Sequence, residues 1–176
     1  FASLLQLSIR YHTLPETSPA IVESMLVLAG TLEPSAIAAA GEANRRPEGA
    51  ALDELLARCL RYSVVALVGL QRRRVWYTVE MLQRMRGFLM EIYTHTHGGQ
   101  RGMQYFEEHA DQRLQQRLGN ALPGYEQPSL RKALSVLLEM LEEDLAELSH
   151  GQLRLGAAQF ALLERVRQGI ESAIHE

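Results

Sequence analysis

Leucines recur at steps of three and four residues between positions 130 and 148, and this spacing constrains the fold more than any other feature. The stripe consists of Leu130, Leu134, Leu137, Leu141, Leu145 and Leu148. Residues three and four apart share one face of an α-helix, so the spacing predicts a helix with one continuous apolar stripe. Pro128 is well placed as its first residue, and Gly151 can cap its end.

Other segments after Pro15 also have helical patterns. We expect long helices over about 50–73 and 75–93, two shorter helical pieces over 103–118, and a final helix over about 155–174. The apolar positions are Leu82, Met85, Leu89 and Ile92 in the second long helix, and Leu155, Ala158, Leu162, Val166 and Ile170 in the final one. Short connections favour antiparallel neighbours, so the sequence predicts an all-α, up-and-down bundle of four to five helices over residues 48–176.

The first residues have a different pattern, because apolar and polar side chains alternate in LLQLSIRYHTL. This is the period of a half-buried β-strand, and a lone strand leaves its backbone donors and acceptors unpaired. We therefore expect one orphan β-strand in residues 1–15, left over from a truncated N-terminal catalytic domain. Pro34 opens a short alanine-rich helix that ends before Pro47, so residues 16–47 are expected to be connecting helices.

Composition excludes several classes of function. A net charge of −3 supplies no general attraction to nucleic acid or to an anionic membrane. The one candidate for a local basic patch consists of Arg72, Arg73 and Arg74, with Arg58, Arg61, Arg84 and Arg86 on neighbouring helical turns. We interpret these arginines as complementing the dipole at a helix C-terminus, and the acidic run 139–147 as a solvated helix face. Cys59 is the only cysteine, which rules out an internal disulfide and fits a cytoplasmic location. No apolar stretch is long enough for a membrane span.

Catalytic motifs are absent from the sequence. There is no glycine-rich phosphate loop and no metalloprotease or esterase signature, and the three aspartates form no strand-borne pair for two magnesium ions. His95 and His97 lack a nearby third ligand, so we expect neither a metal site nor catalytic residues in this chain.

The helix expected over 75–93 carries the best candidate for a binding site. Trp76, Glu80 and Arg84 follow one another at steps of four residues and so share a ridge that is separate from the core face, with Tyr77 beside them. One interpretation is a surface ion pair, with Trp76 covering the end of the bundle. The other is a pocket wall in which an aromatic face, a carboxylate and a guanidinium bind a sugar.

Residues 50–150 resemble the C-terminal helical region of aminoglycoside adenylyltransferase-like nucleotidyltransferases, especially the streptomycin type. The resemblance lies in VWYTVEMLQRMRGFLMEIYTHTHGG, MQYFEEHADQRLQQRL and LPGYEQPSLRKALSVLLEMLEED. The matching residues are Glu80, Arg86, Phe106, Glu107 and Tyr125.

The resemblance implies a bundle that binds the small-molecule acceptor and closes the cleft. Magnesium, ATP and the catalytic carboxylates would then belong to the missing nucleotidyltransferase domain. The resemblance supports a substrate-binding role for Trp76, Tyr77, Glu80 and Arg84. Glu80 is the best candidate among them because an aminoglycoside is cationic and a carboxylate attracts it. The alternative is a non-enzymatic helical module that binds a partner protein or forms a homodimer through the N-terminal strand.

Overall fold

The computed structural model describes residues 33–43, 48–99 and 102–172, and these residues are organised as helices. The helices are α2 (Pro34–Ala43), α3 (Glu48–Gln71), α4 (Val75–Thr96), α5 (Gly102–His109), α6 (Gln112–Asn120), α7 (Gln127–Glu143), α8 (Leu145–Leu148) and α9 (Ala157–Ser172). The prediction of an all-helical protein is confirmed for this part of the chain. The expected strand in residues 1–15 lies outside the described residues.

The chain divides into two compact units between Pro47 and Glu48. Within the first unit, α2 begins at Pro34, whose missing N–H costs no hydrogen bond in the first turn of a helix. The second unit contains the remaining helices and the hydrophobic core.

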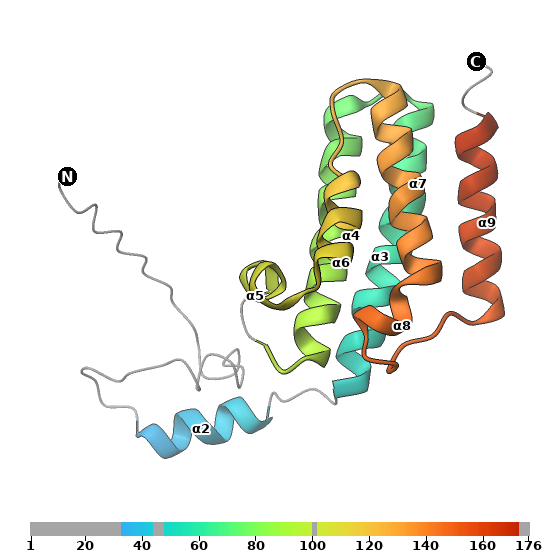
Figure 1. Cartoon of the computed structure of the whole chain (residues 1–176). Coiled ribbons are helices and arrows are strands. Elements are labelled where there is room, and N and C mark those ends of the chain that lie inside the picture. The colour runs from blue at the N-terminus through green and yellow to red at the C-terminus, as the bar shows by residue number, and fades with distance from the viewer. Residues whose placement is uncertain (1–32, 44–47, 100–101, 173–176) are drawn as a thin grey trace, which may run out of the picture. The chain divides into compact units, whose positions relative to one another are not determined.

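The second unit is a helical bundle built mainly from α3, α4, α7 and α9 (Figure 1). Helix α4 packs along α3, α7 contacts both of them, and α9 contacts α3 and α7. Figure 1 shows that α3 and α4 run in opposite directions, as do α7 and α9, while α6 leads the chain back to the end where α7 begins. Within the described residues, none of the helices combines the length and the apolar character that crossing a bilayer demands.

The six leucines of the stripe are all buried, as the sequence predicts. The helix itself is not continuous, because α7 ends at Glu143 and α8 begins at Leu145. Asp144 stands at this break, and its buried carboxylate is bound by two arginines from α6. Gly151 follows α8 with φ of +78°, a left-handed conformation that glycine adopts without strain.

The apolar face predicted for the last helix is partly wrong. Val166 and Ile170 are buried, but Ala158 is exposed, and Leu163 rather than Leu162 lies in the core. Two consecutive leucines fit a helical period equally well, so the spacing alone does not choose between them. By contrast, the four core positions predicted in α4 are all fully buried.

Candidate functional site

The turn between α3 and α4 positions the first candidate residues. Gly69 near the end of α3 lies so close to α4 that an added Cβ atom would stand 2.5 Å from the hydroxyl oxygen of Thr78. The Thr78 hydroxyl donates a hydrogen bond of 2.8 Å to the carbonyl oxygen of Arg74 and so fixes the first turn of α4. Arg73 in the turn has φ of +53°, which is uncommon for a residue other than glycine. The ridge of α4 therefore starts from a tightly packed corner.

Trp76 is the most exposed large apolar side chain in the described part of the chain, with 73% of its surface accessible. Its ring packs against Tyr125 from the connection between α6 and α7, with ring centroids 4.8 Å apart and planes tilted by 52°. An open cavity of about 580 Å³ adjoins this pair and is lined by Arg73, Arg74, Val75, Trp76 and Tyr77. Trp76 and Tyr77 thus stand at one end of the bundle, beside the arginine turn.

Glu80 and Arg84 form the ion pair that their spacing predicts. Both nitrogens of Arg84 that reach Glu80 bind the same carboxylate oxygen, Oε1, at 3.2 Å from Nε and 2.7 Å from Nη2. Arg84 also donates a hydrogen bond of 3.4 Å from Nη1 to the Tyr62 hydroxyl on α3. These contacts, with the bond to Glu80 the largest, raise the pKa of Arg84 above its ordinary value.

The structure does not gather the four candidate residues into one pocket. Trp76 and Tyr77 line the cavity at the turn, whereas Arg84 lines a second groove of about 520 Å³ between α3 and α4. The groove also contains Glu54, Arg58, Arg61, Tyr62 and Phe88. The ridge could be predicted from the sequence because Trp76, Glu80 and Arg84 fall outside the apolar pattern of the core. The sequence gives no signal for Tyr62, which belongs to another helix and faces Arg84.

The other residues that carry the resemblance are dispersed. Phe106 is buried, and its ring lies nearly perpendicular to that of Tyr93, with centroids 5.2 Å apart, whereas Glu107 is exposed. Arg86 donates a hydrogen bond of 2.6 Å to Gln83, and partial burial lowers its pKa. Among the described residues, no hydrogen bond or ion pair joins Glu80, Arg86 and Glu107.

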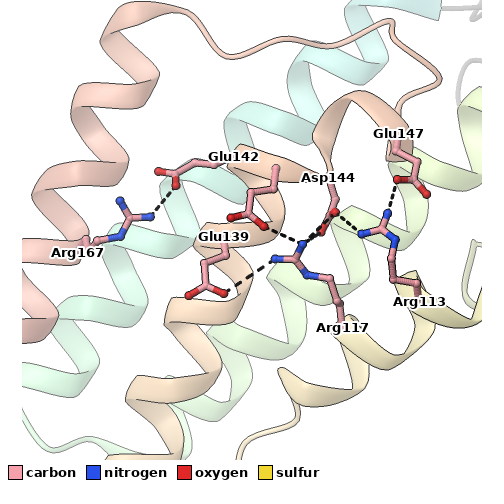
Figure 2. Close-up of polar contacts among 8 residues, drawn as sticks. Arg113, Arg117, Glu139, Glu142, Asp144, Glu147 and Arg167 are labelled. Atoms are coloured by element: carbon pink, nitrogen blue, oxygen red, sulfur yellow. Dashed lines mark hydrogen bonds and ion pairs between the residues drawn. The ribbon is translucent and has the colours of Figure 1, made fainter.

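A network of arginines and acids at the junction of α6, α7 and α8 is a feature that sequence reasoning missed (Figure 2). Arg113 and Arg117 on α6 both reach the buried carboxylate of Asp144, at 2.9 Å and 3.0 Å. Arg113 also pairs with Glu147, and Arg117 with Glu143. The interpretation of the acidic run as a solvated face is therefore wrong for Asp144, which anchors α6 to the end of α7.

The histidines do not form a metal centre within the part of the chain that the structure describes. His95 is exposed, and the His97 ring stacks on Tyr93 with centroids 3.9 Å apart. Among the described residues, no three histidine, cysteine or acidic side chains come together as a possible metal site.

No family model, curated protein or solved structure matches this chain.

Proposed function

We propose that residues 48–176 form the acceptor-binding helical domain of a nucleotidyltransferase, which transfers a nucleoside monophosphate from ATP to a hydroxyl of an aminoglycoside-like small molecule. A separate N-terminal nucleotidyltransferase domain would supply the catalytic carboxylates, magnesium and the ATP site. In this proposal the bundle has four to five helices, residues 1–15 are the terminal strand of that domain, residues 16–47 connect the two domains, and the protein is cytoplasmic. This chain binds the acceptor and closes the cleft.

The observation that carries the proposal is the exposed ring of Trp76, held against Tyr125 at the end of the bundle. A tryptophan is a costly side chain to leave in water, since burying an aromatic ring removes a large apolar area from solvent. The Trp76–Tyr125 pair presents an apolar face next to the polar side chains of Arg73 and Arg74. Such a combination suits the apolar face of a sugar ring.

Glu80 supports the same proposal through its second carboxylate oxygen. Both hydrogen bonds from Arg84 go to Oε1, so Oε2 accepts no hydrogen bond from the described residues. A carboxylate can accept several hydrogen bonds, and those from ammonium groups are among the stronger ones. Glu80 lies one helical turn after Trp76, so a sugar that stacks on the ring would bring an amino or hydroxyl group toward Oε2.

The proposal is tested by titrating the full chain with streptomycin and recording tryptophan fluorescence. Trp76 is the only tryptophan, so the signal reports on this position alone. We expect streptomycin to change the emission, and Glu80→Gln to weaken binding by roughly 1 to 3 kcal/mol, the range for a hydrogen bond to a charged group.

Glu91→Gln is the matched control, because Glu91 is an exposed acid on the same helix, about 16 Å further along at the usual rise per residue. This variant makes the same change in net charge and should bind streptomycin like the unmodified chain. Equal affinity of the Glu80→Gln variant and the unmodified chain would exclude the carboxylate from acceptor binding. Emission that does not respond to streptomycin would count against the site itself.

The same end of the bundle also favours a second candidate function, a protein-interaction module. Leu122 lies in the same connection as Tyr125, and both are exposed, at 60% and 64%. Apolar side chains grouped at one surface are typical of protein interfaces. Sedimentation equilibrium distinguishes the two functions, since a homodimer that Leu122→Ser dissociates would support the interaction module.

A further inference from the structure

The groove between α3 and α4 has a different character from the ridge of α4 beside it. Three guanidinium groups, those of Arg58, Arg61 and Arg84, line the groove together with a single lining carboxylate, that of Glu54. We propose that this groove binds the phosphate group of a small phosphorylated molecule. The inference does not depend on the nucleotidyltransferase proposal and concerns a different surface, which shares only Arg84 with it.

Arg61 is the residue that makes the groove an anion site. Arg58 pairs with Glu54 and Arg84 pairs with Glu80, in each case with an acid one turn earlier on the same helix. Arg61 is exposed and has no ion pair among the described residues, and its guanidinium instead lies 5.4 Å from the centre of the Tyr62 ring. Arg61 is therefore the arginine of the groove whose guanidinium is not engaged in an ion pair.

A second guanidinium, that of Arg84, also lies near the Tyr62 ring. The Arg84 guanidinium lies 5.6 Å from the centre of the Tyr62 ring and donates a hydrogen bond to its hydroxyl. Phe88 supports the ring from α4, with centroids 5.6 Å apart. A guanidinium held near an aromatic ring keeps N–H donors for an anion, and its planar fork matches phosphate oxygens. Two such groups near one ring can bind different oxygens of one phosphate.

The charge and the size of the groove select the class of ligand. Even when Glu80 is counted with Glu54, three arginines face two carboxylates, so the groove favours an anion. Several guanidinium groups can share the three oxygens of a phosphate, whereas a carboxylate offers only two. A volume of about 520 Å³ is in the range of small-molecule sites. A nucleic acid needs a more extended basic surface than this, and the net charge of the chain is −3.

The test is a binding titration of the full chain followed by NMR, with the aromatic resonances of Tyr62 and Phe88 as local reporters. Glycerol phosphate and AMP are the phosphorylated probes, glycerol and adenosine are their uncharged counterparts, and glycerate replaces phosphate by carboxylate. We expect both phosphorylated probes to shift the Tyr62 and Phe88 resonances, with glycerate binding more weakly and the uncharged probes not at all. Tighter binding of AMP than of glycerol phosphate would show that the groove also contacts the nucleoside. Tighter binding of glycerol phosphate would show that the groove recognises the phosphate alone. Both outcomes support the proposal.

Arg61→Gln and Arg165→Gln separate a specific contact from bulk charge. Arg165 is exposed on α9 and has no ion pair among the described residues, so each variant removes one exposed positive charge and breaks no ion pair. Arg61→Gln should weaken AMP binding roughly ten- to a hundredfold, as expected for the loss of a charge-assisted hydrogen bond, while Arg165→Gln binds normally. Far-UV circular dichroism checks that both variants are folded.

Three results would overturn the proposal. One is the absence of any shift at Tyr62 and Phe88 with either phosphorylated probe. Another is equal binding of AMP and adenosine, because the phosphate would then contribute nothing. The third is an equal loss of affinity in the two arginine variants, which would reduce the effect to net charge. None of these results affects the streptomycin titration, which is read at Trp76.

Discussion

Replacing Asp144 by asparagine tests whether the arginine and acid network stabilises the fold. The carboxylate is buried and accepts hydrogen bonds from Arg113 Nη1 at 2.9 Å and from Arg117 Nη1 at 3.1 Å, both on Oδ1. The second oxygen, Oδ2, lies 3.0 Å from Arg117 Nη1 as an ionic contact without hydrogen-bond alignment. Asparagine keeps the shape and one acceptor but removes the negative charge from the centre of the network.

The magnitude follows from the two hydrogen bonds and from the exposure of the arginines. Two hydrogen bonds to a charged group contribute together about 3 to 6 kcal/mol at most. The Arg113 side chain is 50% exposed, so water replaces part of its interaction, and Arg117 keeps Glu143 at 2.8 Å. Asparagine also still accepts one neutral hydrogen bond. We therefore expect Asp144→Asn to lower the free energy of unfolding by about 2 to 3 kcal/mol, below the range for a fully buried broken pair.

Glu143→Gln is the matched control, because Glu143 is the adjacent residue and binds the same arginine. Its side chain is 62% exposed, and an exposed ion pair contributes less than about 1 kcal/mol. Urea unfolding followed by far-UV circular dichroism measures the free energy of unfolding of both variants. An unchanged m-value, the slope of that free energy against urea concentration, would show that only stability has changed. Equal losses in the two variants, or a loss below about 0.5 kcal/mol for Asp144→Asn, would refute the argument that burial makes Asp144 the centre of the network.

Two further predictions concern packing and the buried thiol. Gly69→Ala should lower the free energy of unfolding by about 1 to 3 kcal/mol, since the added Cβ atom would stand 2.5 Å from Thr78 Oγ1. A Cβ atom added at Gly87 meets no neighbouring atom, so Gly87→Ala should raise the free energy of unfolding by about 0.5 to 1 kcal/mol in the same urea assay. Burial raises the pKa of the Cys59 thiol from 9.0 to about 12, so between these pH values the thiol ionises only in the unfolded chain. The free energy of unfolding should therefore keep its full value below pH 9.0 and fall as the pH rises toward 12. Cys59→Ala should remove that part of the pH dependence of urea unfolding, and iodoacetamide should alkylate native Cys59 only as fast as the chain opens.

The helices could be predicted because their signals are local. The spacing of leucines from 130 to 148 gives the buried face and the helical conformation on both sides of Asp144, although not the break at that residue. Pro128 and Gly151 lie close to its limits because of backbone preferences that do not depend on neighbours. Where the local pattern is ambiguous, prediction fails. Leu162 and Leu163 fit the period of α9 equally well, and packing against the rest of the bundle decides between them.

The network around Asp144 could not be predicted because its members are distant in sequence. Asp144 lies 31 residues from Arg113, in an acidic run whose other acids are glutamates of the same charge. What distinguishes Asp144 is its burial at the point where α7 ends, and the sequence period continues across that point without a break. Both arginines that bind Asp144 at the break come from α6, which a local pattern in α7 cannot reveal.

The α4 ridge shows the same limit at the candidate site. A helical wheel separates Trp76, Glu80 and Arg84 from the core, and the structure agrees that all three are exposed. The wheel treats them as one surface, because it contains no information about neighbouring helices. The connection before α7 contributes Tyr125 to Trp76, whereas α3 contributes Tyr62 to Arg84. Since different neighbours adjoin the two ends of the ridge, one face of a single helix borders two cavities with different lining residues. The ligand of each cavity therefore has to be argued from the residues that line it.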